Sequence, residues 1–235
     1  MIRSISAVGI ALCLIQHLMS VPTLFAQEKA QDRWEKEISG IEERIASGKS
    51  PVEAILFVGS SSIRKWKLDE SFPDLKTANH GFGGSQLSDS VDYFERIVTP
   101  VKPSVIVIYA GDNDIASGKT AETVGNDFRA FIEKVEKQLP ACRKVLYLSI
   151  KPSIKRWALA EKMQDTNSSV GKVCESSPRL EFVDIWPAML NKEGKPQADL
   201  FVEDGLHLND QGYAIWTKIL RTHLESIEAT AESAR

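Results

Sequence analysis

The sequence has few of the residues that build disulfide frameworks and metal centres: three cysteines and four histidines in 235 residues. It also has no run of basic residues, and its formal net charge of -3 gives no reason to expect nucleic-acid binding. The apolar stretch Ile5–Met19 is shorter than the ~20 residues that a membrane-spanning helix needs. With 43% hydrophobic and 26% charged residues, the composition is that of an ordinary globular protein.

The first residues have the layout of a secretory signal peptide. Arg3 supplies a positive charge, Ile5–Met19 is mostly apolar, and a short segment rich in small residues ends at Ala26. We therefore predict a signal peptide over residues 1–26, a mature chain that begins near Gln27, and a secreted or periplasmic location. The mature chain would not be stably inserted in a membrane; an uncleaved anchor is the alternative.

Removal of this segment changes the inventory of reactive side chains, because Cys13 and His17 leave with it. Cys142 and Cys174 remain, and in an oxidising compartment they either form a disulfide or stay as two buried thiols. The histidines left to act as a base are His80, His207 and His223.

The rest of the chain alternates apolar runs with amphipathic helical patterns. An N-terminal amphipathic helix is expected at about 28–48. Strands are expected at Ala54–Val58, Leu75–Asn79, Val105–Ala110, Lys144–Ile150 and Leu180–Ile185, with the main helices at about Ser85–Ile97, Ala121–Leu139, Lys155–Val173 and Asn209–Ile227. This alternation predicts an α/β fold in which helices cover both faces of a parallel sheet. Residues 27–235 carry no linker or repeat that would divide them into two domains.

A glycine and three serines, Gly59 to Ser62, follow the first buried strand. Open α/β sheets bind their ligands beyond the carboxyl ends of strands. The serines could form only a turn and a helix cap. One of them could also be a nucleophile, and this reading requires a base and an oxyanion site elsewhere in the chain.

The other parts of such a site occur in later loops of the chain. Gly84 and Asn113 are candidates for the oxyanion site, and Asp204 precedes His207 by three residues. In a tight turn this offset lets the carboxylate reach the imidazole, so the pair could orient and supply a base. Asp112 and Asp114, beside Asn113, could simply satisfy turn backbone.

Motifs of competing enzyme classes are incomplete. Ile63 stands where the G-x-S-x-G nucleophile elbow requires glycine, and Gln86 interrupts a G-x-G-x-x-G pattern. The turn after the first strand lacks the lysine of a P-loop. A metal site is weakly supported because its candidate ligands have no recognised spacing; they are Asp112, Asp114, Asp204 and His207.

Four segments together resemble the four conserved blocks of the SGNH (GDSL-type) hydrolase family, in the family's order. They are Phe57 to Ser62, Gly84, Gly111 to Asp114, and Asp204 to His207. The resemblance extends from about Ile55 to the C-terminal helix. It departs from the family pattern at Ser60 and Ser85, where the family usually has aspartate.

The resemblance implies a three-layer, flavodoxin-like fold with a five-stranded parallel sheet and no cofactor. It implies Ser61 as nucleophile, in preference to the adjacent serines, with His207 as base and Asp204 orienting His207. It also implies an oxyanion hole formed by the backbone N–H groups of Ser61 and Gly84 and the side-chain amide of Asn113.

We therefore expect a serine esterase that hydrolyses small acyl esters, with acetyl groups on carbohydrate as the first candidate. The substrate would be a small-molecule or carbohydrate ester, and no nucleic-acid partner is expected. The alternatives are a lysophospholipase-like lipid acylhydrolase, and a non-catalytic ligand-binding module on the same fold. Neither the length of the acyl chain nor the oligomeric state follows from the sequence.

Overall fold

The computed structural model describes the backbone of residues 21–233 and the side chains of residues 33–230. Residues 1–20 of the predicted signal peptide lie outside the described part. The chain divides into two compact units, Met1–Lys36 and Glu37–Arg235, and the sheet belongs to the second. Among the described residues, no helix combines the length and apolar character required to cross a bilayer.

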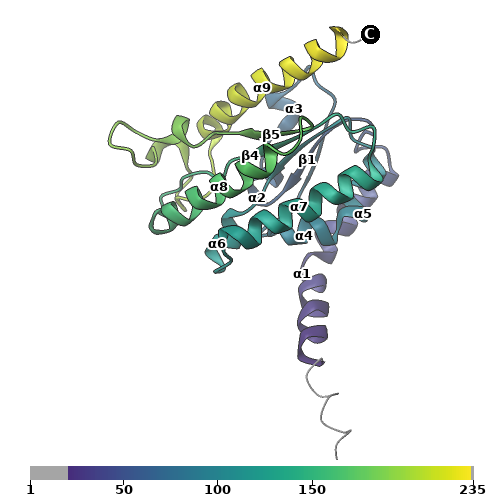
Figure 1. Ribbon diagram of the computed structural model, residues 1–235, viewed down its shortest axis with the longest axis horizontal. Helices are drawn as coiled ribbons and strands as arrows, with labels where there is room; N and C mark the ends of the chain where they lie inside the picture. The colour runs from purple at the N-terminus through teal and green to yellow at the C-terminus, as the bar shows by residue number, and fades with distance from the viewer. Residues whose placement is uncertain (1–20, 234–235) are drawn as a thin grey trace, which may run out of the picture. The chain divides into compact units, whose positions relative to one another are not determined.

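The second unit is built on one parallel five-stranded sheet (Figure 1). Its strands are β1 (Ile55–Gly59), β2 (Thr77–Gly81), β3 (Val105–Tyr109), β4 (Lys144–Leu148) and β5 (Leu180–Val183). They lie in the order β2-β1-β3-β4-β5. Every residue of β1 and β3 is buried, as expected for strands covered on both faces. The predicted α/β fold with a flavodoxin-like strand order is confirmed.

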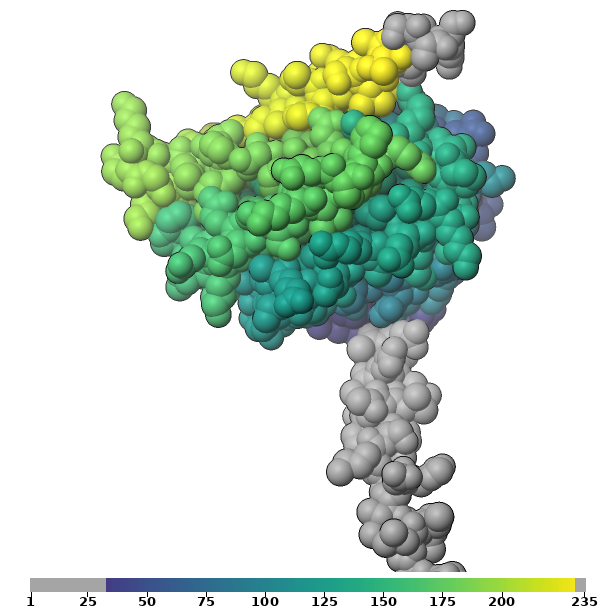
Figure 2. Space-filling model, viewed as in Figure 1, coloured from purple at the N-terminus to yellow at the C-terminus, as the bar shows by residue number. Residues whose placement is uncertain are grey.

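Helices form a layer on each face of the sheet. The α-helices are α1 (Val21–Ala46), α2 (Ser61–Arg64), α3 (Leu68–Ser71), α4 (Leu87–Asp92), α5 (Phe94–Ile97), α6 (Asp112–Ala116), α7 (Ala121–Gln138), α8 (Ala160–Cys174) and α9 (Asp210–Ser233). Short 3₁₀ segments occur at Thr99–Val101, Trp157–Leu159, Pro187–Met189 and Ala198–Leu200. Helices α7 and α8 pack side by side over one face of the sheet, and α9 covers the other (Figure 1). Figure 2 shows these helices at the surface, with α7 and α8 in teal to green and α9 in yellow.

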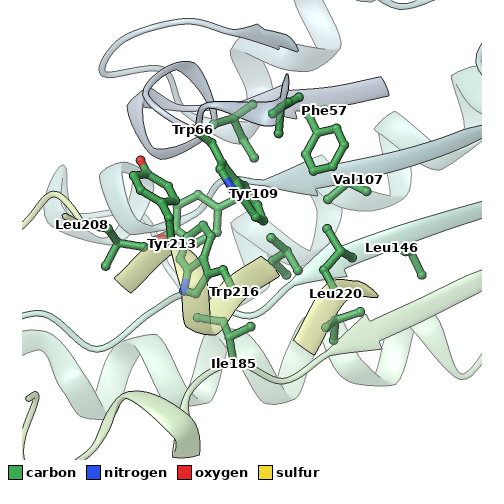
Figure 3. Packing of buried hydrophobic residues seen from close by; sticks show 14 of the residues in the cluster. Phe57, Trp66, Val107, Tyr109, Leu146, Ile185, Leu208, Tyr213, Trp216 and Leu220 are labelled. Carbon is green, nitrogen blue, oxygen red and sulfur yellow. The ribbon is translucent and has the colours of Figure 1, made fainter. Parts of the chain in front are cut away.

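The core between the sheet and α9 is rich in aromatic side chains (Figure 3). Alternate strand residues such as Phe57 and Val107 point to this side, as the period of two in a strand requires. The ring of Trp216 from α9 lies 4.8 Å from that of Tyr109 and 5.5 Å from that of Trp66. This packing attaches α9 to the end of β3 and to the segment that follows α2.

Some local predictions differ from the structure. Helix α1 begins before the expected helix at 28–48 and spans the predicted cleavage point after Ala26. The single helix expected from Ser85 is two helices, α4 and α5. The N-cap of α4 is Gln86, which forms a capping box with Asp89. Ser85, the expected cap, instead donates its hydroxyl to the Phe82 carbonyl. The remaining boundaries shift by a few residues at most, except that α8 begins later and α9 ends later than expected.

Cys142 and Cys174 are buried free thiols. The alternative without a disulfide is therefore the one found in the structure. Burial raises the pKa of both thiols, to about 12 for Cys174. Both side chains consequently act as small apolar groups.

Candidate active site

The candidate site lies where the chain leaves β1 and β3. From β1 the chain passes outward to β2, and from β3 it passes to β4 on the other side, so these ends form the topological switch point of the sheet. Gly59 ends β1 with a φ of +132°, and a Cβ at that position would lie 2.0 Å from the Tyr109 carbonyl oxygen. Glycine is required here because a side chain would collide with that oxygen and because the φ angle is positive. The same oxygen accepts the N–H of Ser60 (3.0 Å).

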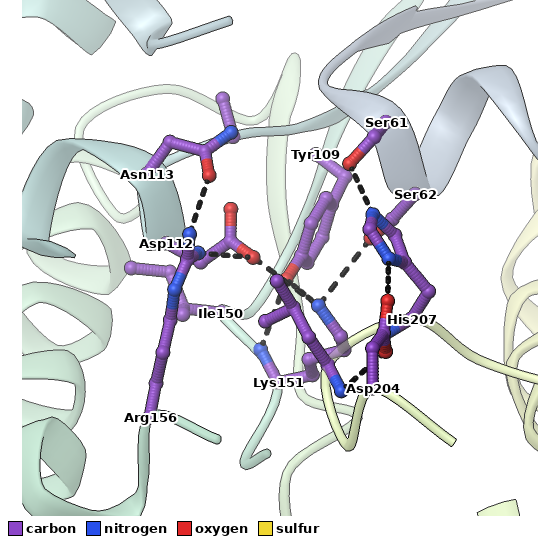
Figure 4. A network of polar contacts seen from close by, with 12 residues as sticks. Ser61, Ser62, Tyr109, Asp112, Asn113, Ile150, Lys151, Arg156, Asp204 and His207 are labelled. Atoms are coloured by element: carbon purple, nitrogen blue, oxygen red, sulfur yellow. Dashed lines mark hydrogen bonds and ion pairs between the residues drawn. The ribbon is translucent and has the colours of Figure 1, made fainter. Parts of the chain in front are cut away.

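Three predicted residues, one from the turn after β1 and two from the turn before α9, are joined by hydrogen bonds (Figure 4). The Ser61 Oγ lies 2.9 Å from His207 Nε2, and His207 Nδ1 lies 2.6 Å from Asp204 Oδ2. Nδ1 donates to the carboxylate, so Nε2 carries no proton in the neutral ring and accepts the hydroxyl of Ser61. This arrangement lets an imidazole remove a proton from a serine hydroxyl.

The neighbouring serines do not take the same position. Ser60 Oγ is buried and has no hydrogen-bond partner among the described residues. Ser62 Oγ accepts a hydrogen bond from Lys151 Nζ (3.3 Å), and the Ser62 carbonyl accepts one from Tyr213 Oη (2.8 Å). Of the three adjacent serines, Ser61 is the one whose hydroxyl contacts His207.

The turn from Asp204 to His207 holds its own geometry. One carboxylate oxygen of Asp204 accepts the N–H of Leu206 (2.8 Å) and of His207 (2.9 Å), while the other contacts the imidazole. Gly205, with a φ of +62°, donates to the Val202 carbonyl. Partial burial raises the pKa of Asp204, but the hydrogen bonds from His207 and Leu206 outweigh it and hold that pKa well below its usual range.

The three predicted oxyanion residues, Ser61, Gly84 and Asn113, follow β1, β2 and β3 respectively. Asn113 Nδ2 donates to the Ser85 carbonyl (2.9 Å), which joins the loop after β3 to the loop that carries Gly84. Gly84 adopts a φ of +74°. The N–H groups of Ser61 and Gly84 have no acceptor among the described residues. The Ser61 N–H is the first of helix α2 and so has no partner within the helix.

A buried ionic cluster beneath the site was missed by the sequence analysis. Asp112 Oδ2 lies 3.2 Å from Lys151 Nζ and 3.2 Å from Arg156 Nη1. Burial raises the pKa of Asp112, but Lys151 and Arg156 more than offset this and keep the carboxylate ionised. The signal was the position of Lys151, a charged residue directly after a buried strand run.

The aspartates considered as metal ligands serve separate contacts. Asp114 accepts the N–H of Leu87 and pairs with Lys119 (3.1 Å), away from the Asp204–His207 pair. Within the described residues, no group of three His, Cys, Asp or Glu side chains could hold a metal ion. The other two candidate histidines make different contacts: the ring of His80 hydrogen-bonds to the Ser50 hydroxyl, and the ring of His223 hydrogen-bonds to the Glu181 carboxylate.

A comparison with family models identifies the family of the chain. A model of the GDSL-like lipase/acylhydrolase family matches residues 58–215, which include all four blocks apart from Phe57. No curated protein is similar enough in sequence to match the chain.

Solved structures share the fold at low sequence identity. A protein from Streptococcus pneumonia described as a platelet activating factor is 22% identical, with a TM-score of 0.75 over 86% of this chain and 98% of that one. A GDSL-like lipase from Bacteroides thetaiotaomicron is 18% identical, with a TM-score of 0.66 over 82% and 99%. An acetylxylan esterase from Geobacillus stearothermophilus is 15% identical, with a TM-score of 0.58 over 72% and 93%.

Proposed function

The chain belongs to the GDSL-like lipase/acylhydrolase family, and from this premise we propose that it is a serine esterase acting through an acyl-enzyme on Ser61. The observation that carries the proposal is the hydrogen-bonded series from Ser61 through His207 to Asp204. A non-catalytic binding module would have no physical need for a serine, an imidazole and a carboxylate in this order.

In the proposed first step, Ser61 Oγ attacks the ester carbonyl carbon while His207 Nε2 takes the hydroxyl proton. The oxyanion formed would accept hydrogen bonds from the N–H groups of Ser61 and Gly84 and from the amide of Asn113. His207 then returns its proton to the leaving alcohol, and the acyl group stays on Ser61. Asp204 holds the imidazole in the required tautomer and stabilises its cationic form.

In the second step a water molecule takes the place of the alcohol. His207 removes a proton from the water, the resulting hydroxide attacks the acyl carbon, and Ser61 leaves with a proton from His207. The products are a carboxylic acid and the free enzyme. The proposed cycle uses the side chains and backbone N–H groups of this chain and one water molecule, and it returns each side chain to its starting protonation state.

Acetyl esters of carbohydrate are the proposed substrates. Support comes from an acetylxylan esterase among the similar structures and from the predicted signal peptide over residues 1–26, which would deliver the protein to an extracytoplasmic compartment. Intact-mass measurement of the exported protein tests the second point, with a chain beginning at Gln27 as the expected result.

A lipid acylhydrolase is the second candidate, and exposed apolar side chains beside the site favour it. Ile154 is 46% and Val202 is 42% exposed. Ile154 lies against Gly205, and the Val202 N–H donates to the His207 carbonyl. An apolar rim of this kind would suit a longer acyl chain, because its contact would remove apolar surface from water.

A series of p-nitrophenyl esters from acetyl to palmitoyl, together with acetylated xylo-oligosaccharides, separates these candidates. We expect kcat/KM to be highest for acetyl esters. Ser61→Ala should lower kcat by about three to six orders of magnitude with the fold intact. A maximum at long acyl chains would favour the lipid substrate instead.

Ser60→Ala is the matched control, because this neighbouring hydroxyl is buried without a hydrogen-bond partner among the described residues. It should keep kcat near the wild-type value. Full activity in Ser61→Ala would refute the acyl-enzyme on this residue. Binding of esters by wild type without any hydrolysis would identify the chain as a binding module.

A further inference from the structure

Arg156 makes a direct contact with the amide that is proposed to bind the oxyanion. Its Nη2 donates to Asn113 Oδ1 at 2.9 Å (Figure 4). On the other side of the same amide, Asn113 Nδ2 donates to the Ser85 carbonyl at 2.9 Å. The oxygen therefore faces a cation and the nitrogen faces an acceptor, so rotating the amide by half a turn would lose both contacts.

A buried ion pair between Asp112 and Lys151 holds Arg156 in place. Its Nη1 lies 3.2 Å from Asp112 Oδ2, and the same oxygen lies 3.2 Å from Lys151 Nζ. The side chains are 17% exposed for Arg156, 6% for Asp112 and 1% for Lys151. Lys151 also donates to the hydroxyls of Tyr109 and Ser62, so the cluster is attached to the ends of both central strands.

Two positive side chains and one negative side chain meet in this cluster. Burial lowers the pKa of Lys151, in spite of the neighbouring Asp112. Asp112 Oδ2 is shared between the two cations, and Asp204 adds a further negative charge that acts on Lys151. A guanidinium in a largely buried site polarises the groups that it contacts more strongly than it would in water.

We propose that Arg156 is a positioning residue for the oxyanion hole, acting through the side-chain amide of Asn113. It fixes the amide so that one N–H of Nδ2 is held by Ser85 and the other is free for the oxyanion. It also withdraws electron density through Oδ1, which makes that N–H a stronger donor. The inference rests on the proposed function, because it assigns Arg156 a role only if Asn113 binds the oxyanion.

A double-mutant cycle tests this role, with kcat and KM measured for wild type, Arg156→Gln, Asn113→Ala and the double variant on an acetyl ester. Arg156→Gln should lower kcat by about 10- to 100-fold with little change in KM, since displacing a catalytic group by about 1 Å has effects of that size. In the Asn113→Ala background the same substitution should change kcat by no more than about two-fold. Equal losses in both backgrounds would refute action through Asn113.

Arg156→Lys gives a second, conservative comparison in case Arg156→Gln folds poorly. Lysine keeps the charge but cannot span Asp112 and Asn113 with a planar fork, so kcat should fall between those of wild type and Arg156→Gln. Binding of a boronic acid, which mimics the tetrahedral intermediate, should weaken in parallel with kcat. A purely structural role would lower stability without this selective loss, and that result would overturn the proposal.

Lys155→Gln is the matched control, because it removes a positive charge from the residue before Arg156, and its exposed side chain is not one of the ion-pair partners of Asp112. We expect it to keep the wild-type kcat. The same variants distinguish a failure of the acyl-enzyme proposal from a failure of the proposed role of Arg156. If Ser61→Ala keeps activity, the acyl-enzyme mechanism fails, whereas a normal Arg156→Gln enzyme beside an inactive Ser61→Ala refutes only the role of Arg156.

Discussion

Asp204 shows how a short turn can fix the position and charge of a side chain in the proposed catalytic site. Its two oxygens accept two backbone N–H groups and the His207 ring. These bonds lower its pKa against the effect of partial burial. A carboxyl group whose folded pKa is lowered adds stability above its unfolded pKa and loses it as the pH falls through the folded value. Asp204 is therefore ionised wherever His207 can act as a base.

Asn113 is the residue on which the proposed transition-state stabilisation depends most directly. Its amide is held at both ends, by Ser85 and by Arg156, so it would not have to reorganise when charge develops on the substrate. We expect Asn113→Ala to lower kcat by about 100- to 1,000-fold, because removal of one preorganised donor has this effect. Initial rates on p-nitrophenyl acetate measure it, and an enzyme within a few-fold of wild type would assign the oxyanion to backbone groups alone.

At the scale of elements, the loop after β3 is attached to helix α4 through one buried side chain. Both oxygens of Asp114 lie within 3.2 Å of the Leu87 N–H, at the first residue of α4. Lys119 bridges Asp114 and the more exposed Asp127. The loop that carries Gly84 and the loop that carries Asn113 thus share a common support.

Removal of this support should destabilise the fold. Asp114→Ala leaves the buried N–H of Leu87 without an acceptor, and we expect the free energy of unfolding to fall by about 2 to 3 kcal/mol. Asp127→Ala removes the other partner of Lys119 near the surface and should cost under about 1 kcal/mol. Urea denaturation of both variants measures the difference, and equal losses would show that the Leu87 contact is unimportant.

At the scale of the whole molecule, stability should depend on pH through a buried histidine. His80 in β2 contacts Ser50 Oγ (2.6 Å) and the Ile97 carbonyl (2.5 Å), and so joins the segment after α1 to the end of α5. Burial lowers its pKa to about 4, although the Ile97 carbonyl favours the charged form. As the pH falls from 6.5 towards 4, His80 takes up a proton in the unfolded chain but stays neutral in the folded chain, so the free energy of unfolding decreases.

We expect wild type to lose about 2 kcal/mol more stability between pH 7 and pH 4.5 than His80→Gln does. Urea denaturation at the two pH values tests this, and identical pH dependence in the two proteins would contradict it. Asp89 provides a control of opposite sign, because burial raises its pKa to about 6. Its protonation favours the folded state as the pH falls through that value, so Asp89→Asn should lose more stability in acid than wild type.

The sequence alone determined the features that depend on near neighbours in the chain. Uninterrupted apolar runs separated by helical patterns predicted the parallel sheet, because strand burial and helix amphipathicity have different periods. The three-residue offset between Asp204 and His207 predicted their contact, since both belong to a single turn. The order of the four blocks was sufficient for the family, which the family model confirms.

The tertiary structure decided the contacts between distant segments. Ser61 and His207 are 146 residues apart, and three adjacent serines differ only in which hydroxyl the strand end and turn direct towards the imidazole. The partners of Asp112 come from the loop after β4, about 40 positions along the chain. No local period specifies these pairs, because they depend on β3 and β4 being adjacent in the sheet and on the packing that closes their loops over one edge.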